Sequence, residues 1–182
     1  DDKLIMDVNV LVEGGLIKTI SQDPIEAGDD GIVIGGGGRT LMPGLIDAHV
    51  HLAIAANFGQ IESDFTAGDL HLNAAVAARH TFLDGFTSVR DVGGPVFGLK
   101  RAIDAGKFLG PRIYPSGSFI GQTSGHADFR SRNDPNPTLY GEDFSNFSRF
   151  GIATVADGRD AVLAATRQNL MQGASQIKIM IG

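Results

Sequence analysis

The sequence predicts an α/β protein, the N-terminal half of a (β/α)₈ TIM barrel preceded by strands of a small β-sandwich. Residues 43–182 alternate strand-like apolar runs with helix-like segments, which is typical of parallel sheets. Residues 1–42 instead show short alternating runs around glycines. About 140 residues follow Gly44, whereas a complete barrel needs roughly 250. The alternative is a small doubly wound sheet, complete in itself.

The first segment, residues 1–42, is predicted to be antiparallel. The run DVNVLVEGGLIKTIS, residues 7–21, alternates on both sides of Gly14-Gly15 and indicates a β-hairpin. The run GIVIGGGGRTL, residues 31–41, predicts a short strand and a glycine-rich turn. This turn lacks the Lys-Ser/Thr ending of a phosphate-binding loop, so we do not assign it that role.

After Pro43-Gly44 the predicted elements alternate. Asp69 is expected to cap the first helix and Gly85 to end it. The apolar stripes expected on the first and last helices are Leu72, Val76 and Leu83, and Val162, Leu163, Leu170 and Met171. A long loop is expected over residues 121–158. The strands are predicted at 45–53, 86–92, 112–120 and 176–182, and the helices at 70–85, 95–106 and 159–173.

Composition narrows the possible functions. The net charge is −6 without a long single-sign run, which disfavours a nucleic-acid partner. No apolar run reaches membrane-spanning length, so we expect no membrane span, and either a cytoplasmic or a secreted mature form. The chain has no cysteine, which leaves imidazole and carboxylate groups as metal ligands.

Two of the five histidines stand one residue apart in LMPGLIDAHVHLA, residues 41–53. Side chains at i and i+2 of a strand point to the same face, so His49 and His51 can bind one metal ion together. Alone, this spacing more often belongs to two histidines that hydrogen-bond to loops near a strand end.

The flanking residues are more specific. The segment PGLIDAHVH, residues 43–51, resembles the first barrel strand of the amidohydrolase superfamily, whose members are metal-dependent hydrolases. The hairpin around Gly14-Gly15 and the turn GGGGRTLMPG resemble the sandwich strands that precede the barrel in this family. The resemblance implies that His49 and His51 are metal ligands.

Lys178 is the next candidate, within QIKIMIG. A lysine between apolar strand residues is usually an edge or rim residue. Desolvation, however, favours a neutral, nucleophilic amine that can add carbon dioxide to form a carbamate. In amidohydrolases with two metals, a carboxylated lysine on the fourth barrel strand bridges the cations. Lys178 lies on the fourth predicted strand, so the resemblance implies this role.

The segment SFIGQTSGHADFR, residues 118–130, resembles a substrate-proximal loop of one subgroup. The subgroup comprises imidazolonepropionase-like and prolidase-like dipeptidases and ochratoxin-hydrolysing amidases. This resemblance implies that His126 contacts the substrate. It also implies that Arg130 binds a carboxylate of the substrate. Asp128 is a weaker candidate in the same loop.

Three other positions receive smaller roles. His71 and His80 lie on opposite sides of one predicted helix, so they cannot share an ion. We expect His71 to face solvent and His80 to pack. Asp91 ends the second strand and is expected to support the site structurally. Asp47 is expected to orient the end of the first strand.

The resemblance implies a binuclear amidohydrolase that cleaves a peptide-like amide, a dipeptide or N-acyl amino acid, with a metal-activated hydroxide. It implies two divalent cations, with zinc the expected metal, and a dipeptidase- or carboxypeptidase-like metallopeptidase. The remaining ligands and the catalytic aspartate belong to later strands, so no catalytic residue is expected in this chain. The implied partners are the complementary C-terminal half of the barrel and a small peptide-like substrate, and the complete enzyme is expected to be a homo-oligomer.

Two other functions stay open. The chain can be a non-catalytic half-barrel that serves binding or assembly. If one metal binds, Lys178 is an ordinary lysine and the chemistry is closer to that of a cyclic-amide hydrolase or deaminase. The joint presence of His49, His51 and Lys178 favours the binuclear enzyme.

Overall fold

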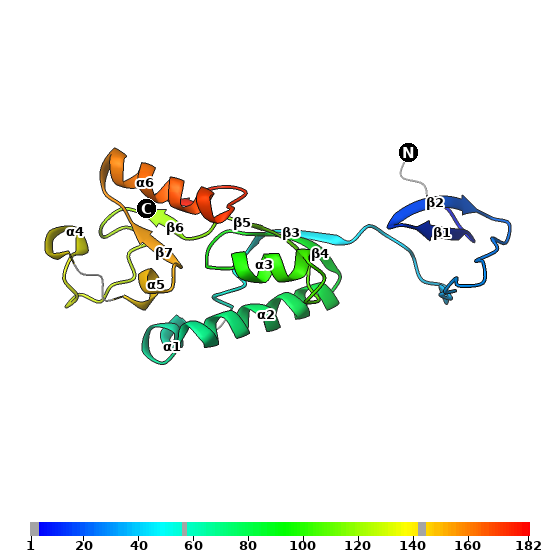
Figure 1. Ribbon diagram of the computed structural model, residues 1–182, viewed down its shortest axis with the longest axis horizontal. Helices are drawn as coiled ribbons and strands as arrows, with labels where there is room; N and C mark the ends of the chain where they lie inside the picture. Colours follow the sequence, from blue (N-terminus) through cyan, green and yellow to red (C-terminus); the bar gives the residue numbers. More distant parts are fainter. Residues whose placement is uncertain (1–3, 56–57, 142–144) are drawn as a thin grey trace. The chain divides into compact units, whose positions relative to one another are not determined.

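The computed structural model describes residues 4–55, 58–141 and 145–182. The chain forms two compact units, one that ends at Met42 and one that begins at Pro43 (Figure 1). Within the described segments, no helix is both long enough and apolar enough to cross a bilayer.

The first unit contains an antiparallel hairpin. Strand β1 (Asn9–Glu13) pairs with β2 (Leu16–Ser21), and Glu13 faces Leu16 across the turn. Gly14 and Gly15 have φ angles of 57° and 78°. Two positive φ angles are what a tight two-residue hairpin turn needs, and glycine adopts them without strain. The predicted hairpin is therefore confirmed.

The prediction of a strand within residues 31–41 is wrong. These residues adopt turns and irregular backbone in the structure. Ile32, Val33 and Ile34 are 88%, 82% and 84% exposed. A strand needs a neighbouring ladder, and β1 and β2 pair only with each other among the described residues. The sandwich to which these residues were assigned stays a prediction.

The second unit is built on two three-stranded sheets, with strand orders β3-β4-β5 and β7-β6-β8. Every pairing in both sheets is parallel, which confirms the predicted parallel arrangement. The sheets do not close into a barrel within the described residues. The strands are β3 (Leu45–Val50), β4 (Phe86–Asp91), β5 (Arg112–Pro115), β6 (Phe119–Gly121), β7 (Ala153–Val155) and β8 (Ile179–Met180).

The strand predicted over residues 112–120 is divided in two. Pro115 ends β5, the N–H of Ser116 makes one last bond to the Asp91 carbonyl of β4, and Gly117 with a φ of 73° then turns the chain out of the ladder. β5 therefore pairs with β4, while β6 pairs with β7 and β8. The strand predicted over residues 176–182 is reduced to β8, because its neighbour β6 is only three residues long.

Three helices occur where the sequence predicted them, and three short helices and β7 lie in segments that were expected to be loops. The short run ATV of β7 follows Gly151, a brief signal that is easily taken for loop. The helices are α1 (Phe58–Ser63), α2 (Ala67–Leu83), α3 (Phe97–Asp104), α4 (Pro137–Tyr140), α5 (Asn146–Arg149) and α6 (Gly158–Gln172).

The N-terminus of α2 differs from the expectation. Thr66, not Asp69, is the N-cap, and Asp69 is the third helical residue of a capping box. The Thr66 Oγ1 accepts the Asp69 N–H at 3.3 Å, and the Asp69 carboxylate accepts the Thr66 N–H at 2.9 Å. This reciprocal arrangement satisfies two N–H groups at once, which a lone Asp cap does not.

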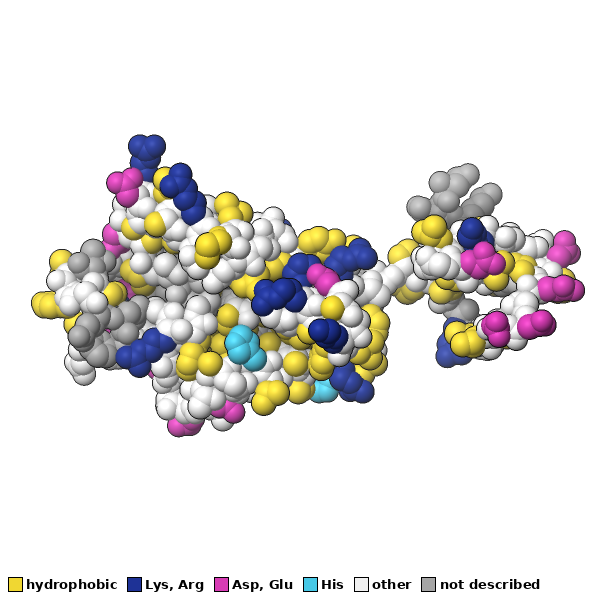
Figure 2. Space-filling model, in the orientation of Figure 1, with side chains coloured by type: hydrophobic (Ala, Val, Ile, Leu, Met, Phe, Trp, Pro, Cys, Tyr) yellow, Lys and Arg dark blue, Asp and Glu magenta, His cyan; other side chains and the backbone are white. Residues whose placement is uncertain are grey.

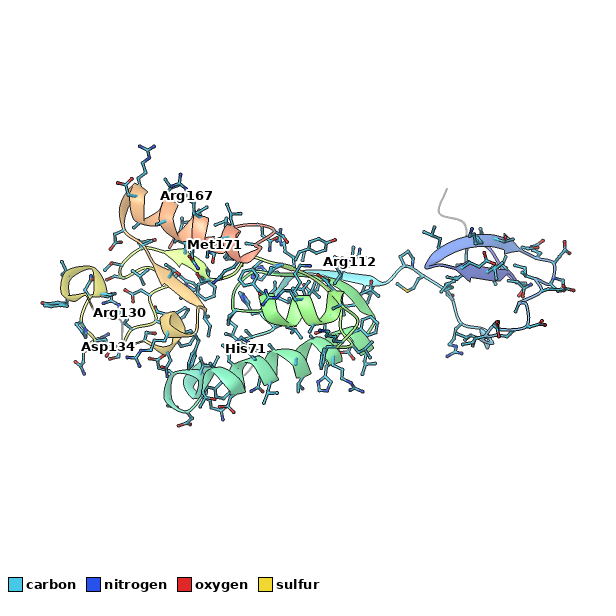
Figure 3. All side chains as sticks on the ribbon, in the orientation of Figure 1. His71, Arg112, Arg130, Asp134, Arg167 and Met171 are labelled. Carbon is cyan, nitrogen blue, oxygen red and sulfur yellow. The ribbon has the colours of Figure 1, made fainter. Side chains whose placement is uncertain are left out.

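The buried face of α2 also differs from the predicted stripe. Leu70, Ala74 and Ala78 are buried. The predicted stripe residues Leu72, Val76 and Leu83 are exposed, and so is His80, which was expected to pack. Because alanine side chains are small, the Ala74 and Ala78 face allows the helix to approach the core closely. His71 is exposed, as expected, and projects from α2 in Figure 3.

The core of the second unit contains residues from strands, helices and loops. Val89 of β4, Ile113 of β5 and Ile61 of α1 are fully buried. They belong to the same apolar cluster as Leu70 and Phe119. Leu52 and Ala53 of the loop after β3 and Val96 of the loop after β4 are members of this cluster, so the loops of the candidate site are anchored in the core.

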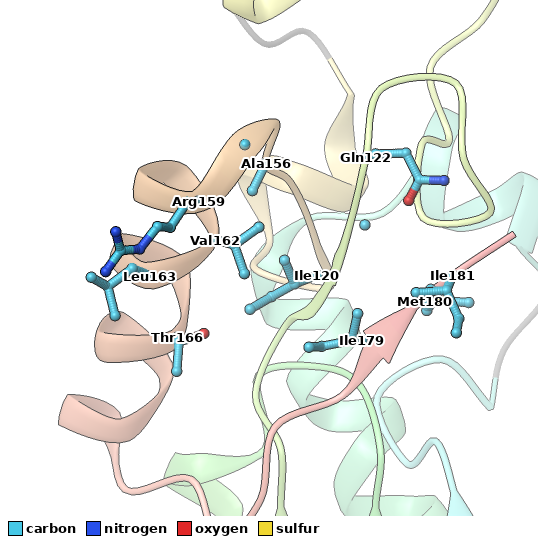
Figure 4. Close-up of a pocket in the computed structure, with 12 residues that line it drawn as sticks. Ile120, Gln122, Ala156, Arg159, Val162, Leu163, Thr166, Ile179, Met180 and Ile181 are labelled. Carbon is cyan, nitrogen blue, oxygen red and sulfur yellow. The ribbon is translucent and has the colours of Figure 1, made fainter.

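The predicted stripe of α6 is largely exposed, because Leu163, Leu170 and Met171 are 39%, 53% and 74% accessible. The buried residue of α6 is Asn169. Val162 and Leu163 line an apolar groove of about 590 Å³ between α6 and β8, together with Ile179 (Figure 4). Hydrophobic side chains are also spread over the visible face of the second unit (Figure 2).

Candidate metal centre

His49 and His51 lie at the carboxyl end of β3. His49 lies within β3 and is exposed. His51 is the first residue after the end of β3 and is half-buried. Their ring centroids are 5.4 Å apart, with an interplanar angle of 65°. The structure therefore brings the two imidazoles to the same side of the chain, as their spacing predicted.

His51 has the more restrictive surroundings. Its Nδ1 is 3.5 Å from the carbonyl oxygen of Gly93, and its ring meets the Phe119 ring edge-on at a centroid distance of 6.2 Å. Burial lowers the pKa of His51, the Gly93 carbonyl opposes this, and the charges of His49 and Lys178 lower the pKa further. The lowered pKa favours the neutral imidazole, which is the form that binds metals.

Two aspartates support the loop that carries the histidines. The Asp47 carboxylate accepts the backbone N–H of His49 at 2.9 Å. Asp91 is fully buried, and its carboxylate accepts the backbone N–H of Leu52 at 2.8 Å. Both carboxylates thus bind backbone groups, the supporting role that the sequence suggested.

The pKa of Asp91 reflects two opposing effects. Burial is the larger effect and raises the pKa, the N–H groups of Leu52 and Gly93 lower it, and the net result is a pKa of about 7. Desolvation disfavours the charged form, and the two donors favour it. The ionised carboxylate is the stronger acceptor for both bonds, so the two N–H groups favour that form.

Lys178 comes immediately before β8 rather than in the middle of a strand. Its side chain is half-buried, and its backbone carbonyl accepts the N–H of Ile120 at 2.9 Å. The charge of Lys178 contributes to the lowered pKa of His51. Lys178 and His51 therefore interact electrostatically although more than 120 residues separate them in the sequence.

The candidate substrate loop is held mainly by its own contacts. The His126 side chain is exposed, and its backbone N–H donates to the Gly182 carbonyl at 2.8 Å. Arg130 Nε donates to Asp128 at 2.7 Å, and its Nη1 donates to the Pro135 carbonyl at 2.9 Å. A substrate carboxylate would therefore compete with Asp128 for Arg130. Arg130 lies near Asp134 in the loop before α4 (Figure 3).

Aromatic rings connect this loop with the histidines. Phe119, which contacts His51, also packs edge-on against Phe129 at 5.8 Å. Phe129 in turn stacks on Phe147 of α5 at 4.5 Å. The row of rings extends from the end of β3 to the candidate substrate loop, and no local pattern in the sequence reveals it.

Gln176 is a further residue that sequence reasoning missed. Its side-chain amide donates to the carbonyls of Asp91 at 3.2 Å and Tyr114 at 2.9 Å. These bonds fix the segment before Lys178 against β4 and β5. Gln176 shares the i, i+2 spacing with Lys178, which is the only sequence signal that could have drawn attention to it.

The donor set fits part of a divalent-metal site. Two imidazoles and one nearby amine suit zinc and related ions, the amine only after it gains a carboxylate. Among residues 4–55, 58–141 and 145–182, no three His, Asp or Glu side chains are grouped to hold an ion. The described part of the chain therefore offers a two-histidine contribution, to which Lys178 can add.

The fold and this arrangement define a parallel α/β protein with a histidine pair at the carboxyl end of its first parallel strand. The sequence profile of the amidohydrolase family matches residues 40–181. The chain belongs to the amidohydrolase family.

Individual relatives agree with this assignment. Ochratoxinase from Aspergillus niger is 31% identical over 157 residues, which cover 77% of this chain and 30% of that protein. A crystal structure of an amidohydrolase matches with a TM-score of 0.81 and 37% identity, over 96% of this chain and 42% of that one. A prolidase in complex with N-methylphosphonate-L-proline matches with a TM-score of 0.79 and 34% identity, over 94% and 41%. The chain thus spans less than half the length of each of these relatives.

Proposed function

We propose that this chain contributes the first ligands of a binuclear metal site in a hydrolase that cleaves peptide-like amide bonds. His49 and His51 would hold the metal, with zinc as the preferred ion, and Lys178 would join them as a carboxylated lysine. The observation that carries the proposal is the 5.4 Å approach of the two imidazole rings, combined with the electrostatic effect of Lys178 on His51.

When bound, the cations would supply an activated water and polarise the scissile carbonyl. The residues of this chain have simpler tasks. His51 offers a neutral imidazole, and the carbonyl of Gly93 orients its ring. Asp47 fixes the backbone of His49. The proton transfer to the leaving amine is assigned to an aspartate outside this chain.

The proposed substrate is a dipeptide or an N-acyl amino acid. This choice is supported by the likeness to the prolidase complex and to ochratoxinase. His126 and Arg130 are the proposed substrate contacts. The ion pair between Asp128 and Arg130 holds a guanidinium in the candidate loop, and a substrate carboxylate would compete with Asp128 for it.

We also propose that residues 43–182 are the first four β/α units of a (β/α)₈ barrel and that activity requires the complementary half. Support comes from the parallel strands and from the exposed groove between α6 and β8, which includes Ile181 at 89% exposure. An open edge of a parallel sheet with apolar flanks needs a partner, because parallel sheets are normally covered. The 1–42 unit would form part of the family's small β-sandwich.

The test uses the complete protein that contains this chain. Metal content is measured by mass spectrometry, and hydrolysis is measured on proline dipeptides and N-acyl amino acids. We expect two metal ions per active unit, and native spectra should carry the mass of one carbon dioxide on the peptide with Lys178. H49N and H51N should each lose metal and activity, and H71N on α2 is the matched histidine control.

Three results would contradict the proposal. Full metal content in H51N would exclude His51 as a ligand. An active protein with one metal and an unmodified Lys178 would favour the mononuclear alternative. A complete protein without metal or hydrolysis would favour the binding-module alternative.

A further inference from the structure

Among the residues that the structure describes, Asp91 is the most buried charged residue that the proposed chemistry does not use directly. It ends β4, its side chain is fully buried, and both carboxylate oxygens accept backbone N–H groups. Oδ2 accepts from Leu52 at 2.8 Å, and Oδ1 accepts from Gly93 at 3.1 Å. One side chain thus joins the loop after β3 to the loop after β4.

These two bonds lie on either side of His51. Leu52 is the next residue in the chain, and the carbonyl of Gly93 faces His51 Nδ1 at 3.5 Å. A carbonyl can only accept, so this contact favours a proton on Nδ1 and leaves the lone pair on Nε2. The distance is at the outer limit of a hydrogen bond, so small shifts of Gly93 decide whether the contact forms.

Gly93 has little room to move. A Cβ at this position would lie 2.3 Å from Phe119 Cδ1 and 3.0 Å from His51 Nδ1. The backbone of Gly93 is therefore enclosed between the Phe119 ring, the His51 ring and the Asp91 carboxylate. Asp91 holds the N–H of Gly93, and the N–H of Gly94, which shares a peptide group with the Gly93 carbonyl, donates to the Gly117 carbonyl at 3.1 Å. The bond to Asp91 therefore fixes the Gly93 backbone on the side that leads to β4.

The backbone carbonyl of Asp91 extends the same connection toward Lys178. It accepts the N–H of Ser116 at 2.9 Å and the side-chain amide of Gln176 at 3.2 Å. Gln176 stands two residues before Lys178. Asp91 therefore touches the three segments that carry or support His51 and Lys178.

We propose that Asp91 is a positioning residue: its carboxylate holds the loops after β3 and β4 together so that His51 presents Nε2 to a divalent cation. The inference rests on the proposed function, because it assumes that His51 binds metal. It differs from a general role in stability, because it predicts a change at one imidazole nitrogen. Asp91 does not touch the reacting groups itself.

The experiment measures two quantities in the complete protein. The Nδ1/Nε2 tautomer of His51 is read by NMR from nitrogen shifts in metal-free, isotope-labelled protein. Zinc affinity is read by competition with a chromophoric chelator. We expect D91N to lower zinc affinity about 10–100-fold, the usual range for residues that orient metal ligands. We also expect it to reduce the Nδ1–H population of His51, because an amide cannot accept both N–H groups.

A matched control separates positioning from stability. Asp69 also accepts a backbone N–H, that of Thr66, but it does so at the N-terminus of α2. D69N should therefore destabilise its helix cap while the His51 tautomer and the zinc affinity stay at wild-type values. Circular dichroism and thermal melting establish that each variant is folded.

A folded D91N variant with wild-type zinc affinity and an unchanged His51 tautomer would overturn the inference. If the wild-type protein binds no zinc, the proposed function fails, while the tautomer comparison in metal-free protein still decides the role of Asp91. If D91N does not fold, D91E takes its place. It keeps the charge, but its longer side chain cannot keep both bonds, so wild-type values in D91E would overturn the inference equally.

Discussion

Asn169 of α6 binds both backbone groups of Ser118. Its Oδ1 accepts the Ser118 N–H at 3.2 Å, and its Nδ2 donates to the Ser118 carbonyl at 2.8 Å. Asn169 is 2% exposed and Ser118 8%. The side chain thus takes the place of a neighbouring strand at the start of β6 and attaches α6 to the sheet through polar contacts.

N169A should lower the free energy of unfolding by about 2–4 kcal/mol, because it leaves the N–H and the carbonyl of Ser118 buried without partners. Urea denaturation measures the change. N73A is the control, since the exposed Asn73 of α2 donates to the Asp69 carbonyl at 2.8 Å. Its effect should stay within about 0.5 kcal/mol. Equal effects of the two variants would show that burial of the Asn169 amide is unimportant.

G93A should disturb the candidate metal centre. The added Cβ would lie 2.3 Å from Phe119 Cδ1, and Phe119 is 2% exposed, so its ring has little space to yield. Overpacking of this kind costs about 1–3 kcal/mol. We expect lower thermal stability and weaker zinc binding in the same variant.

G98A provides the comparison for this prediction. A Cβ at Gly98 of α3 would meet nothing nearer than Arg101 Nη2 at 3.9 Å. Alanine in a helix is favoured over glycine by about 1 kcal/mol, so G98A should be neutral or stabilising. If G93A melts and binds zinc as the wild type does, the close packing around Gly93 is not required.

The sequence predicted the features that depend on nearby residues. The hairpin at Gly14-Gly15, the three longer helices and the approach of the His49 and His51 rings follow from turn chemistry and short-range periodicity. The parallel pairing of the strands also followed from their alternation with helices.

Features that depend on distant residues could not be predicted in this way. The apolar stripes of α2 and α6 were assigned to the wrong face, because Ala78 and Asn169 face the core in their place. The bond between Leu52 and Asp91 joins residues 39 positions apart, so the sequence indicated a supporting role for Asp91 but not its partner. The effect of Lys178 on His51 likewise depends on how β8 pairs with β6.

The ion pair between Asp128 and Arg130 should make the free energy of unfolding depend on pH in the acid range. The hydrogen bond from Arg130 lowers the pKa of Asp128 below its ordinary value, and burial opposes this. Because the pKa is lower in the folded state, the unfolded state binds more protons as the pH falls below about 5. The stability from this pair is complete above the unfolded pKa and is lost as the pH falls through the folded pKa.

In R130Q, the free energy of unfolding should therefore decrease less steeply as the pH falls than it does in the wild type. Denaturation midpoints at several pH values from about 7 to about 3 measure the difference between wild type and variant. The difference between the denaturation midpoints of wild type and R130Q should be largest at neutral pH and should decrease as the pH falls. R167Q on the exposed side of α6 serves as the control for loss of one positive charge. Parallel profiles for wild type and R130Q would contradict a folded-state shift in the pKa of Asp128.

The groove between α6 and β8 allows a test of the proposed complementary half. Ile181 lines the groove and is 89% exposed. If the complementary half covers it, I181D would place a charge in an apolar interface, and assembly of this chain with that half should weaken at least about tenfold. Native mass spectrometry of the two halves, expressed as separate chains, measures the assembled fraction.

L139D is the control for this experiment, because Leu139 of α4 is 75% exposed and lies outside the groove. It introduces the same charge at a comparable apolar position, so it should leave the assembled fraction at the wild-type level. Loss of assembly in both variants would indicate a general response to surface charge. Unchanged assembly in I181D would instead place the contact on another face, such as the exposed Leu72 and Val76 of α2.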